Sequence, residues 1–259
     1  MPFIQTKDVR IHYDLAGPAT APALVFSNSL GATLSMWDPQ IPALEKQFRI
    51  LRYDTRGHGE SSVTPGPYSI EQLAHDVLAL LDALQLDRVY FCGLSMGGQT
   101  GMWLALNAPV RLHKLVLSNT AAKIGTPEIW DTRIEAVRKG GMKSISTAVM
   151  ERWFSANFRS NSSGAVAGIK SRFENTNPEG YIANCAAIRD FDVREAVAAI
   201  RIPTLVIAGT HDAATTPLDG HYLADHIAGA RYVEFDAAHL SNIEVPERFS
   251  SEVSSLLLS

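Results

Sequence analysis

The sequence predicts an α/β fold in which a mostly parallel sheet is flanked by helices and carries an inserted helical cap. Short apolar runs alternate with amphipathic helical stretches along most of the chain, and one central stretch breaks this alternation. Strands that alternate with helices form parallel sheets covered on both faces. With 259 residues, of which 46% are hydrophobic, the chain is long enough to bury a large core.

Apolar runs bounded by polar or glycine-rich loops predict the strands. They span residues 11–15, 23–27, 48–54, 89–92, 115–118, 204–208 and 232–235. The first clear helix begins after Ser69, which fits a capping box with Gln72, and its apolar residues recur every three or four positions up to Leu84. Further helices are expected over residues 98–104, 218–227 and 246–258.

Residues 122–199 do not follow the alternation of strands and helices. Helix-forming stretches lie at residues 130–139 and 145–154. Polar segments at residues 159–164 and 174–180 break the region. We interpret the region as a helical cap above the carboxyl ends of the strands, where open α/β sheets bind ligands. Residues 1–121 and 200–259 then form the core. The alternative is a small separate domain with no role in the site.

Ser95 lies at the centre of Gly93-Leu94-Ser95-Met96-Gly97, directly after an apolar run and directly before a predicted helix. This strand, turn and helix is the context of a nucleophile elbow. A serine pushed out of so tight a turn has a strained backbone, so its neighbours two residues away on each side must be small. Gly93 and Gly97 meet that requirement, and Ser95 is the predicted nucleophile.

A serine hydroxyl needs a base to take its proton and an acid to orient the base, and after an elbow the acid precedes the histidine in the chain. The histidines downstream of Ser95 are His113, His211, His221, His226 and His239. His239 follows the last predicted strand in a loop of small residues and is the predicted base. His221 and His226 are expected on a helix surface, and their spacing does not fit a metal site, so no metal is predicted.

Two aspartates are candidates for the acid. Asp212 follows the apolar run 204–208 and a turn, which is where a triad acid belongs. Asp236 is the rival, but it lies three residues before His239 and would compete with the hydrogen bonds of its own loop. We therefore favour Asp212.

Acyl transfer also requires N–H donors aimed at the oxyanion. The residue after the nucleophile supplies one, which makes Met96 the first candidate. The second donor should come from the loop after the strand at 23–27, and the spacing to Trp37 suggests Leu30.

Composition excludes several other classes of function. The net charge of −4 and the absence of basic runs argue against nucleic-acid binding. Residues 1–14 include Lys7, Asp8 and Arg10 and have no signal-peptide core, and no apolar stretch is long enough to cross a membrane. Two cysteines imply no disulfide framework. We expect a cytoplasmic protein with no cofactor and no membrane partner.

Several motifs spread along the chain narrow this prediction. They are Ser27-Asn28-Ser29-Leu30-Gly31 with Trp37, Tyr53-Asp54-Thr55-Arg56-Gly57-His58-Gly59-Glu60-Ser61, Gly93 to Gly98, Ser118-Asn119-Thr120-Ala121-Ala122, Trp130 with Arg133-Ile134, Gly209-Thr210-His211-Asp212, and Ala238-His239-Leu240-Ser241-Asn242. The chain resembles the α/β-hydrolase family and, over nearly its whole length, the 3-oxoadipate enol-lactonases of bacterial aromatic catabolism. Many relatives carry His-Gly in place of Asn28-Ser29, and this departure fits the lactonase subgroup.

The resemblance implies an α/β-hydrolase fold and a serine hydrolase that opens a small anionic lactone to 3-oxoadipate through an acyl-enzyme on Ser95. An arginine suits the substrate carboxylate because its fork pairs with both oxygens. The resemblance assigns this role to Arg133, with Trp130 as an apolar wall and with Trp153 and Arg152 as weaker candidates. The polar loop at 54–61 is interpreted as a brace for the site.

Two other classes of function remain open. One is a different α/β hydrolase with the same Ser95, Asp212 and His239, such as a carboxylesterase, a carbon–carbon bond hydrolase or a perhydrolase. The other is a non-catalytic receptor that binds a ligand through the cap. The oligomeric state is left open by the sequence.

Overall fold

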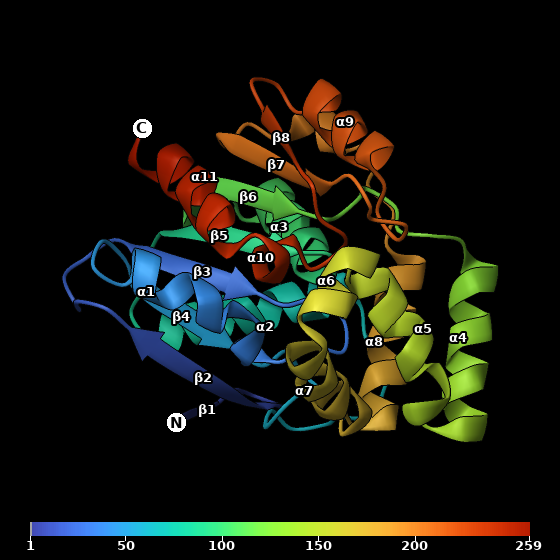
Figure 1. The fold of residues 1–259 in the computed structure, drawn as a ribbon. Coiled ribbons are helices and arrows are strands. Elements are labelled where there is room, and N and C mark those ends of the chain that lie inside the picture. The colour runs from blue at the N-terminus through green and yellow to red at the C-terminus, as the bar shows by residue number, and fades with distance from the viewer. Residues whose placement is uncertain (1) are drawn as a thin grey trace.

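The computed structural model describes residues 2–259 and contains one eight-stranded sheet with the order β1-β2-β4-β3-β5-β6-β7-β8 (Figure 1). The strands are β1 (Phe3–Gln5), β2 (Arg10–Ala16), β3 (Ala23–Ser27), β4 (Arg49–Tyr53), β5 (Val89–Leu94), β6 (Leu112–Ser118), β7 (Thr204–Gly209) and β8 (Arg231–Phe235). All pairs from β4 to β8 along the sheet are parallel, whereas β1 and β2 are antiparallel additions at one edge. The predicted mostly parallel α/β architecture is confirmed.

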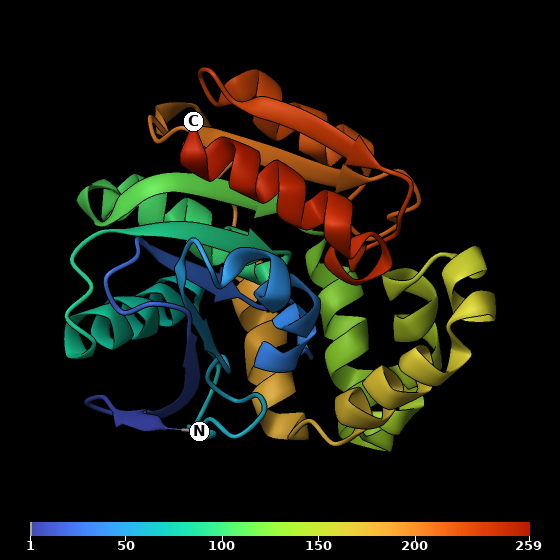
Figure 2. The same ribbon diagram turned by 60° about the vertical axis from the view of Figure 1, so that its left-hand side comes forward.

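Helices cover both faces of this sheet. They are the 3₁₀ helix η1 (Leu34–Gln40), α1 (Ile41–Leu44), α2 (Ile70–Ala83), α3 (Met96–Asn107), the 3₁₀ helix η2 (Pro109–Arg111), α9 (Pro217–His226), α10 (Ser241–Glu244) and α11 (Pro246–Leu258). Figure 2 shows α11 lying across one face of the sheet. The Ser69 hydroxyl caps α2 by accepting the Gln72 N–H at 3.1 Å, which is one of the two bonds of the predicted capping box.

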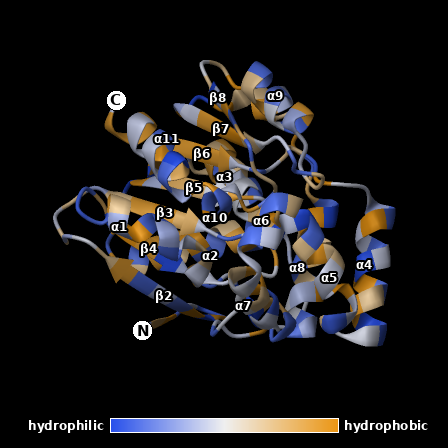
Figure 3. Ribbon diagram, viewed as in Figure 1, coloured by the Kyte–Doolittle hydropathy of each residue, from blue (hydrophilic) through white to orange (hydrophobic). Residues whose placement is uncertain are grey.

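Successive residues of the central strands pack into two separate hydrophobic cores, one on each face of the sheet. Leu24 and Phe26 of β3 pack in the cluster that contains Trp37, whereas Val25 between them packs in the cluster that contains Val77 of α2. Side chains of a strand alternate between the two faces of a sheet, so a strand covered on both sides must be apolar throughout. Figure 3 shows mainly hydrophobic colouring in β7, all of whose residues are buried.

Five helices lie between β6 and β7 and form what we term the helical segment, residues 127–190. They are α4 (Pro127–Gly140), α5 (Lys143–Trp153), α6 (Ala156–Asn161), α7 (Ser163–Glu174) and α8 (Pro178–Asp190), and the short 3₁₀ helix η3 (Val197–Ala199) follows. The segment lies beside the carboxyl ends of the parallel strands (Figure 1). No helix within residues 2–259 combines the length and apolarity needed to cross a bilayer.

The prediction of a polar break at residues 159–164 is wrong, because this stretch is helical except at Ser162, where α6 ends and α7 begins. Phe158 on α6 and Val166 and Ile169 on α7 are partly buried against the main hydrophobic cluster. This packing stabilises two short helices whose polar composition argues against them, since tertiary contacts override propensity.

The loop after β4 is braced by a buried arginine. Arg56 is 2% exposed, and its Nε donates to Asp76 of α2 at 2.7 Å while its Nη1 donates to Asp8 and to Thr64, each at 3.0 Å. Asp76 is itself buried. A buried ion pair is costly to break because it leaves the remaining charge without compensation.

We expect Arg56→Met to lower the free energy of unfolding by about 3 to 5 kcal/mol, because Asp76 loses its counter-charge. The double variant Arg56→Met/Asp76→Leu should recover much of this loss. Urea titration measures both effects, with Arg138→Met, which removes an exposed pair with Glu135, as a control that changes stability little. Equal losses in the single and double variants would contradict the buried-pair account.

Candidate active site

Ser95 joins β5 to α3 in a strained conformation, with φ 59° and ψ −115°. Non-glycine residues rarely adopt positive φ, and such strain persists only where the surroundings enforce it. A Cβ at Gly93 would collide with the Gly97 carbonyl, and a Cβ at Gly97 would collide with the Ser27 carbonyl. The turn is held further by the Ser95 N–H, which donates to the Ser118 carbonyl at 2.9 Å.

Ser95 opens into a cavity of about 170 Å³ at the junction of the sheet and the helical segment. The cavity is lined from the sheet side by Ser29, Leu30, Ser95 and His239, and from the helical segment by Trp130, Arg133, Arg152, Trp153 and Tyr181, among others. Every side chain predicted to contact substrate therefore faces the same space as the predicted nucleophile.

His239 and Asp212 form a buried pair beside this cavity. Asp212 lies in the loop after β7 and His239 in the loop after β8, and His239 Nδ1 is 2.7 Å from Asp212 Oδ2. Asp236, the rival acid, instead lies 2.7 Å from His211 Nε2 at an exposed position. The structure thus brings Asp212, and not Asp236, to His239.

Four donors besides His239 hold the Asp212 carboxylate. The N–H groups of Ala214 and Thr215 donate to Oδ1 at 2.8 and 3.1 Å, and the Thr215 hydroxyl and Asn119 Nδ2 donate to Oδ2 at 2.8 and 3.1 Å. Burial acts to raise the pKa of Asp212, but His239 and the bonds from Thr215 outweigh it and lower the pKa below its ordinary value. The carboxylate stays ionised and available to orient His239.

Asn119 was not singled out as a site residue by sequence reasoning, although it directly follows β6 within a quoted motif. It has φ 44°, a conformation that asparagine tolerates better than most residues. Its Oδ1 accepts the hydroxyls of Ser118 and Ser241 at 2.9 and 2.6 Å, which leaves Nδ2 to face Asp212. A polar residue at the carboxyl end of a strand is the one signal that could have found it.

Leu30 and Met96, the predicted oxyanion donors, lie in backbone segments that pack together. The Gly97 N–H donates to the Asn28 carbonyl at 3.0 Å, which holds the loop after β3 against the first turn of α3. Trp37 Nε1 donates to Asn28 Oδ1 at 2.9 Å and fixes the same loop. Met96 is the first residue of α3, and N–H groups of a first turn have no acceptor within their helix.

His58 supports the loop from its other side. The Gly31 N–H, next to Leu30, donates to His58 Nε2 at 2.8 Å, so this ring nitrogen carries no proton. Burial lowers the pKa of His58 from its ordinary value of 6.5 to about 4, which keeps the ring neutral. The structure therefore supports the interpretation of the polar loop at 54–61, which contains His58, as a brace for the site.

Ser29 contacts the predicted base, which the sequence did not reveal. Its hydroxyl is 3.5 Å from His239 Nε2, and the two residues are 210 positions apart in the chain. No local pattern predicts a contact of this kind.

The helical segment presents two arginines to the cavity. The Arg133 guanidinium lies 5.0 Å from the centre of the Trp130 ring, a cation–π arrangement. Trp130 is held by its Nε1, which donates to the Ile124 carbonyl at 2.7 Å. Arg152 lines the same cavity one helix further on.

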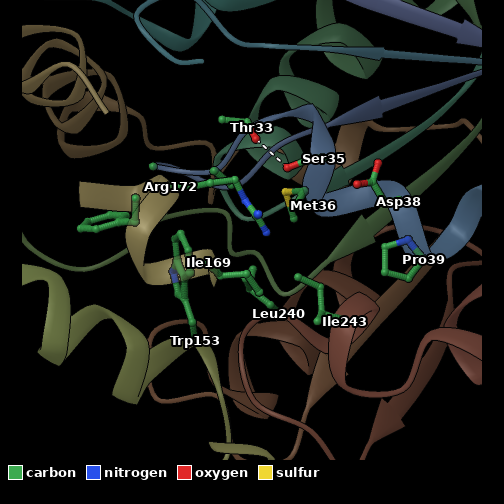
Figure 4. Close-up of a pocket in the computed structure, with 13 residues that line it drawn as sticks. Thr33, Ser35, Met36, Asp38, Pro39, Trp153, Ile169, Arg172, Leu240 and Ile243 are labelled. Atoms are coloured by element: carbon green, nitrogen blue, oxygen red, sulfur yellow. Dashed lines mark hydrogen bonds between the residues drawn. The ribbon is translucent and has the colours of Figure 1, made fainter. Parts of the chain in front are cut away.

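Trp153 separates this cavity from a second one of about 180 Å³. Figure 4 shows Trp153 beside Leu240 and Ile243 in that second cavity, with Arg172 extending towards Met36. Within residues 2–259, no group of three His, Cys, Asp or Glu side chains could hold a metal ion.

The model of the alpha/beta hydrolase fold family matches residues 22–246. The chain belongs to the α/β-hydrolase family. This α/β-hydrolase is 42% identical to 3-oxoadipate enol-lactonase 2 of Acinetobacter baylyi over 254 residues, which cover 98% of this chain and 95% of that protein. It is 32% identical to a putative carbamate hydrolase of Rhizobium rhizogenes over 94% of this chain and 96% of the relative.

Solved structures agree with this α/β-hydrolase over its full length. The enol-lactonase from Burkholderia xenovorans has a TM-score of 0.98 at 48% identity, with 100% of both chains covered. A thermophilic esterase from Thermogutta terrifontis has a TM-score of 0.91 at 28% identity, with 99% of this chain and 98% of that one covered.

The buried neutral state of His58 predicts a dependence of stability on pH. The unfolded chain binds a proton at His58 near pH 6.5 and the folded chain only near pH 4, so stability is full above pH 6.5 and falls as the pH drops towards 4. We expect wild type to lose about 2 to 3 kcal/mol more than His58→Gln between pH 7.5 and 4.5. Gln retains an oxygen for the Gly31 N–H but does not titrate. Denaturant titration at both pH values measures the difference, and parallel pH dependences would contradict it.

Proposed function

We propose that this α/β-hydrolase opens 3-oxoadipate enol-lactone with water to give 3-oxoadipate, through an acyl-enzyme on Ser95. The observation that carries the proposal is one cavity of about 170 Å³ that joins Ser95 and the His239–Asp212 pair to the arginines of the helical segment. A small lactone with a free carboxylate requires a nucleophile with its base for the ring carbonyl and a cation for the carboxylate, and this cavity has both. The enol-lactonase names of the relatives in Acinetobacter baylyi and Burkholderia xenovorans support the same substrate.

In the first half of the reaction, the Ser95 hydroxyl attacks the lactone carbonyl carbon while His239 Nε2 takes its proton. Asp212 holds the other ring nitrogen and stabilises the imidazolium. The N–H groups of Leu30 and Met96 bind the oxyanion. Collapse breaks the bond to the ring oxygen, which leaves as an enolate. The proton held by His239 neutralises the enolate, which becomes a ketone by protonation at carbon, and His239 is neutral again. An enolate needs less help from an acid than an alkoxide would.

In the second half, His239 takes a proton from water as the water attacks the acyl carbon. The ester bond to Ser95 breaks, the proton passes to its oxygen, and the new carboxylate is released. Ser29 lies beside His239 Nε2 and adds a second polar group on the side of the cavity where this water must bind. No cofactor takes part in either half.

Substrate binding is assigned to a cap formed by residues 122–199, set on a core of residues 1–121 and 200–259. Arg133 pairs with the substrate carboxylate, and Trp130 provides an apolar wall that also orients the guanidinium. The cytoplasmic location expected from the sequence is retained as part of this proposal.

Ser95→Ala should lower turnover of the enol-lactone by about 10⁴-fold or more, because the step that forms the acyl-enzyme loses its nucleophile. A spectrophotometric assay of lactone opening measures this, with Ser163→Ala on α7 as a matched control. Turnover of simple aryl esters well above that of the lactone would favour a carboxylesterase. Absence of both turnover and labelling of Ser95 by a serine-reactive phosphonate would favour a receptor.

Arg133→Ala should raise the KM for the lactone by about 10- to 100-fold, the loss expected for a hydrogen bond between charged groups. The KM for a neutral aryl ester should change much less. Arg138→Ala is the control, because Arg138 lies on the same helix in an exposed pair with Glu135. Equal changes for both substrates would mean that Arg133 acts on the structure and not on the carboxylate.

A further inference from the structure

The loop that carries His239 is held on both sides of the histidine, by the helical segment on one side and by α10 on the other. The Leu240 N–H, directly after His239, donates to the Trp153 carbonyl at 3.0 Å. The Ala238 N–H, directly before it, donates to Glu244 Oε1 at 3.0 Å. Both peptide groups next to the predicted base therefore depend on residues outside its own loop.

Glu244, at the end of α10, also binds the corner between α5 and α6. Its Oε1 accepts the Ser155 N–H at 3.0 Å, and its Oε2 accepts the Ser155 hydroxyl at 2.5 Å. One half-buried carboxylate thus accepts three hydrogen bonds, one from the His239 loop and two from the helical segment. These three donors account for the position of the Glu244 carboxylate.

We propose that Glu244 is a positioning residue that joins the His239 loop to the helical segment, so that the base and the substrate-binding wall keep a fixed relation. The inference rests on the proposed function and adds a residue to it. Trp153 lies two residues before Ser155 and lines the cavity together with Ser95 and His239. Figure 4 shows the Trp153 and Leu240 side chains next to one another at this junction.

The consequence concerns proton transfer. A catalytic group must be held within about 0.5 Å of its productive position, and a displacement of about 1 Å costs about 100-fold in rate. Without Glu244 the Ala238 N–H has no acceptor, so the loop is held less tightly by its remaining bonds and the His239 ring shifts relative to Ser95. Ser155 loses its acceptor at the same time, which loosens the wall formed by Trp153.

The test compares the kcat of each variant for p-nitrophenyl acetate and for the lactone. Each kcat is the maximal rate divided by the concentration of active sites, which is titrated with a phosphonate. Glu244→Ala should lower kcat for both substrates by about 10- to 100-fold and slow phosphonate labelling of Ser95 by a similar factor. Glu244→Gln should stay within about 3-fold of wild type, because its amide oxygen accepts both N–H groups and its NH₂ donates to the Ser155 hydroxyl.

Ser155→Ala weakens only the end of the junction at the helical segment. It removes the hydroxyl bond to Glu244 and the cap on the Phe158 N–H, and it leaves the Ser155 N–H and Ala238 N–H bonds to Glu244 in place. It should raise the KM for the lactone several-fold while kcat and the labelling rate stay within about 2-fold of wild type. Glu247→Ala is the matched control, because it removes an exposed carboxylate three positions further on and should change neither parameter.

Four results would overturn the inference. A per-site kcat and labelling rate of Glu244→Ala equal to wild type, with only a lower Tm, would assign Glu244 to stability alone. Activity of Glu244→Gln as low as that of Glu244→Ala would assign the effect to charge. If Glu244→Ala does not fold, an unchanged KM in Ser155→Ala is the overturning result. Failure of wild type itself to react with phosphonate or ester would overturn the proposed function, and this inference with it.

Discussion

The close approach of three backbone segments at Ser95 is the constraint on which the rest of the site depends. Gly93, Gly97 and the Ser27 carbonyl meet at distances that admit no side chain, and Ser95 is held at positive φ as a result. The same contact brings the loop that contains Leu30 against the first turn of α3. Backbone packing therefore positions Ser95, the proposed nucleophile, and Leu30 and Met96, the proposed oxyanion donors, and a larger residue at either glycine would displace all of them together.

The buried carboxylate of the site and the cations of its cavity come from different parts of the fold. Asp212 is buried, and an isolated buried charge is costly, so the loops after β6, β7 and β8 surround it with donors from Asn119, Thr215 and His239. The cationic side chains of the cavity, Arg133 and Arg152, come instead from α4 and α5. Under the proposed function, this separation lets the helical segment select for an anionic substrate while the loops of the sheet hold Asp212 and His239.

The parts of the fold that the sequence predicted are those encoded by local patterns. The elbow around Ser95 and the apolar run at 23–27 require only neighbouring residues, and β3 has the predicted bounds. β1 has three residues and is partly exposed, so it lacks an apolar signal, and α6 and α7 depend on tertiary packing that overrides their polar composition. Contacts such as Ser29 with His239 and Ser155 with Glu244 join residues 210 and 89 positions apart, and no periodicity encodes them.

The helical segment is hydrogen-bonded to two loops of the sheet, the loop at 54–61 and the loop that carries His239. Asn184 of α8 donates to the Arg56 carbonyl at 2.9 Å, in the loop whose His58 supports Gly31 next to Leu30. Trp153 accepts the Leu240 N–H next to His239. A segment that swung as a rigid lid would have to break the Asn184 bond to the loop at 54–61 and the Trp153 bond to the loop that carries His239 together. These contacts favour a largely preformed cavity, in which specificity depends on the identity of side chains such as Trp130 and Arg133 rather than on closure.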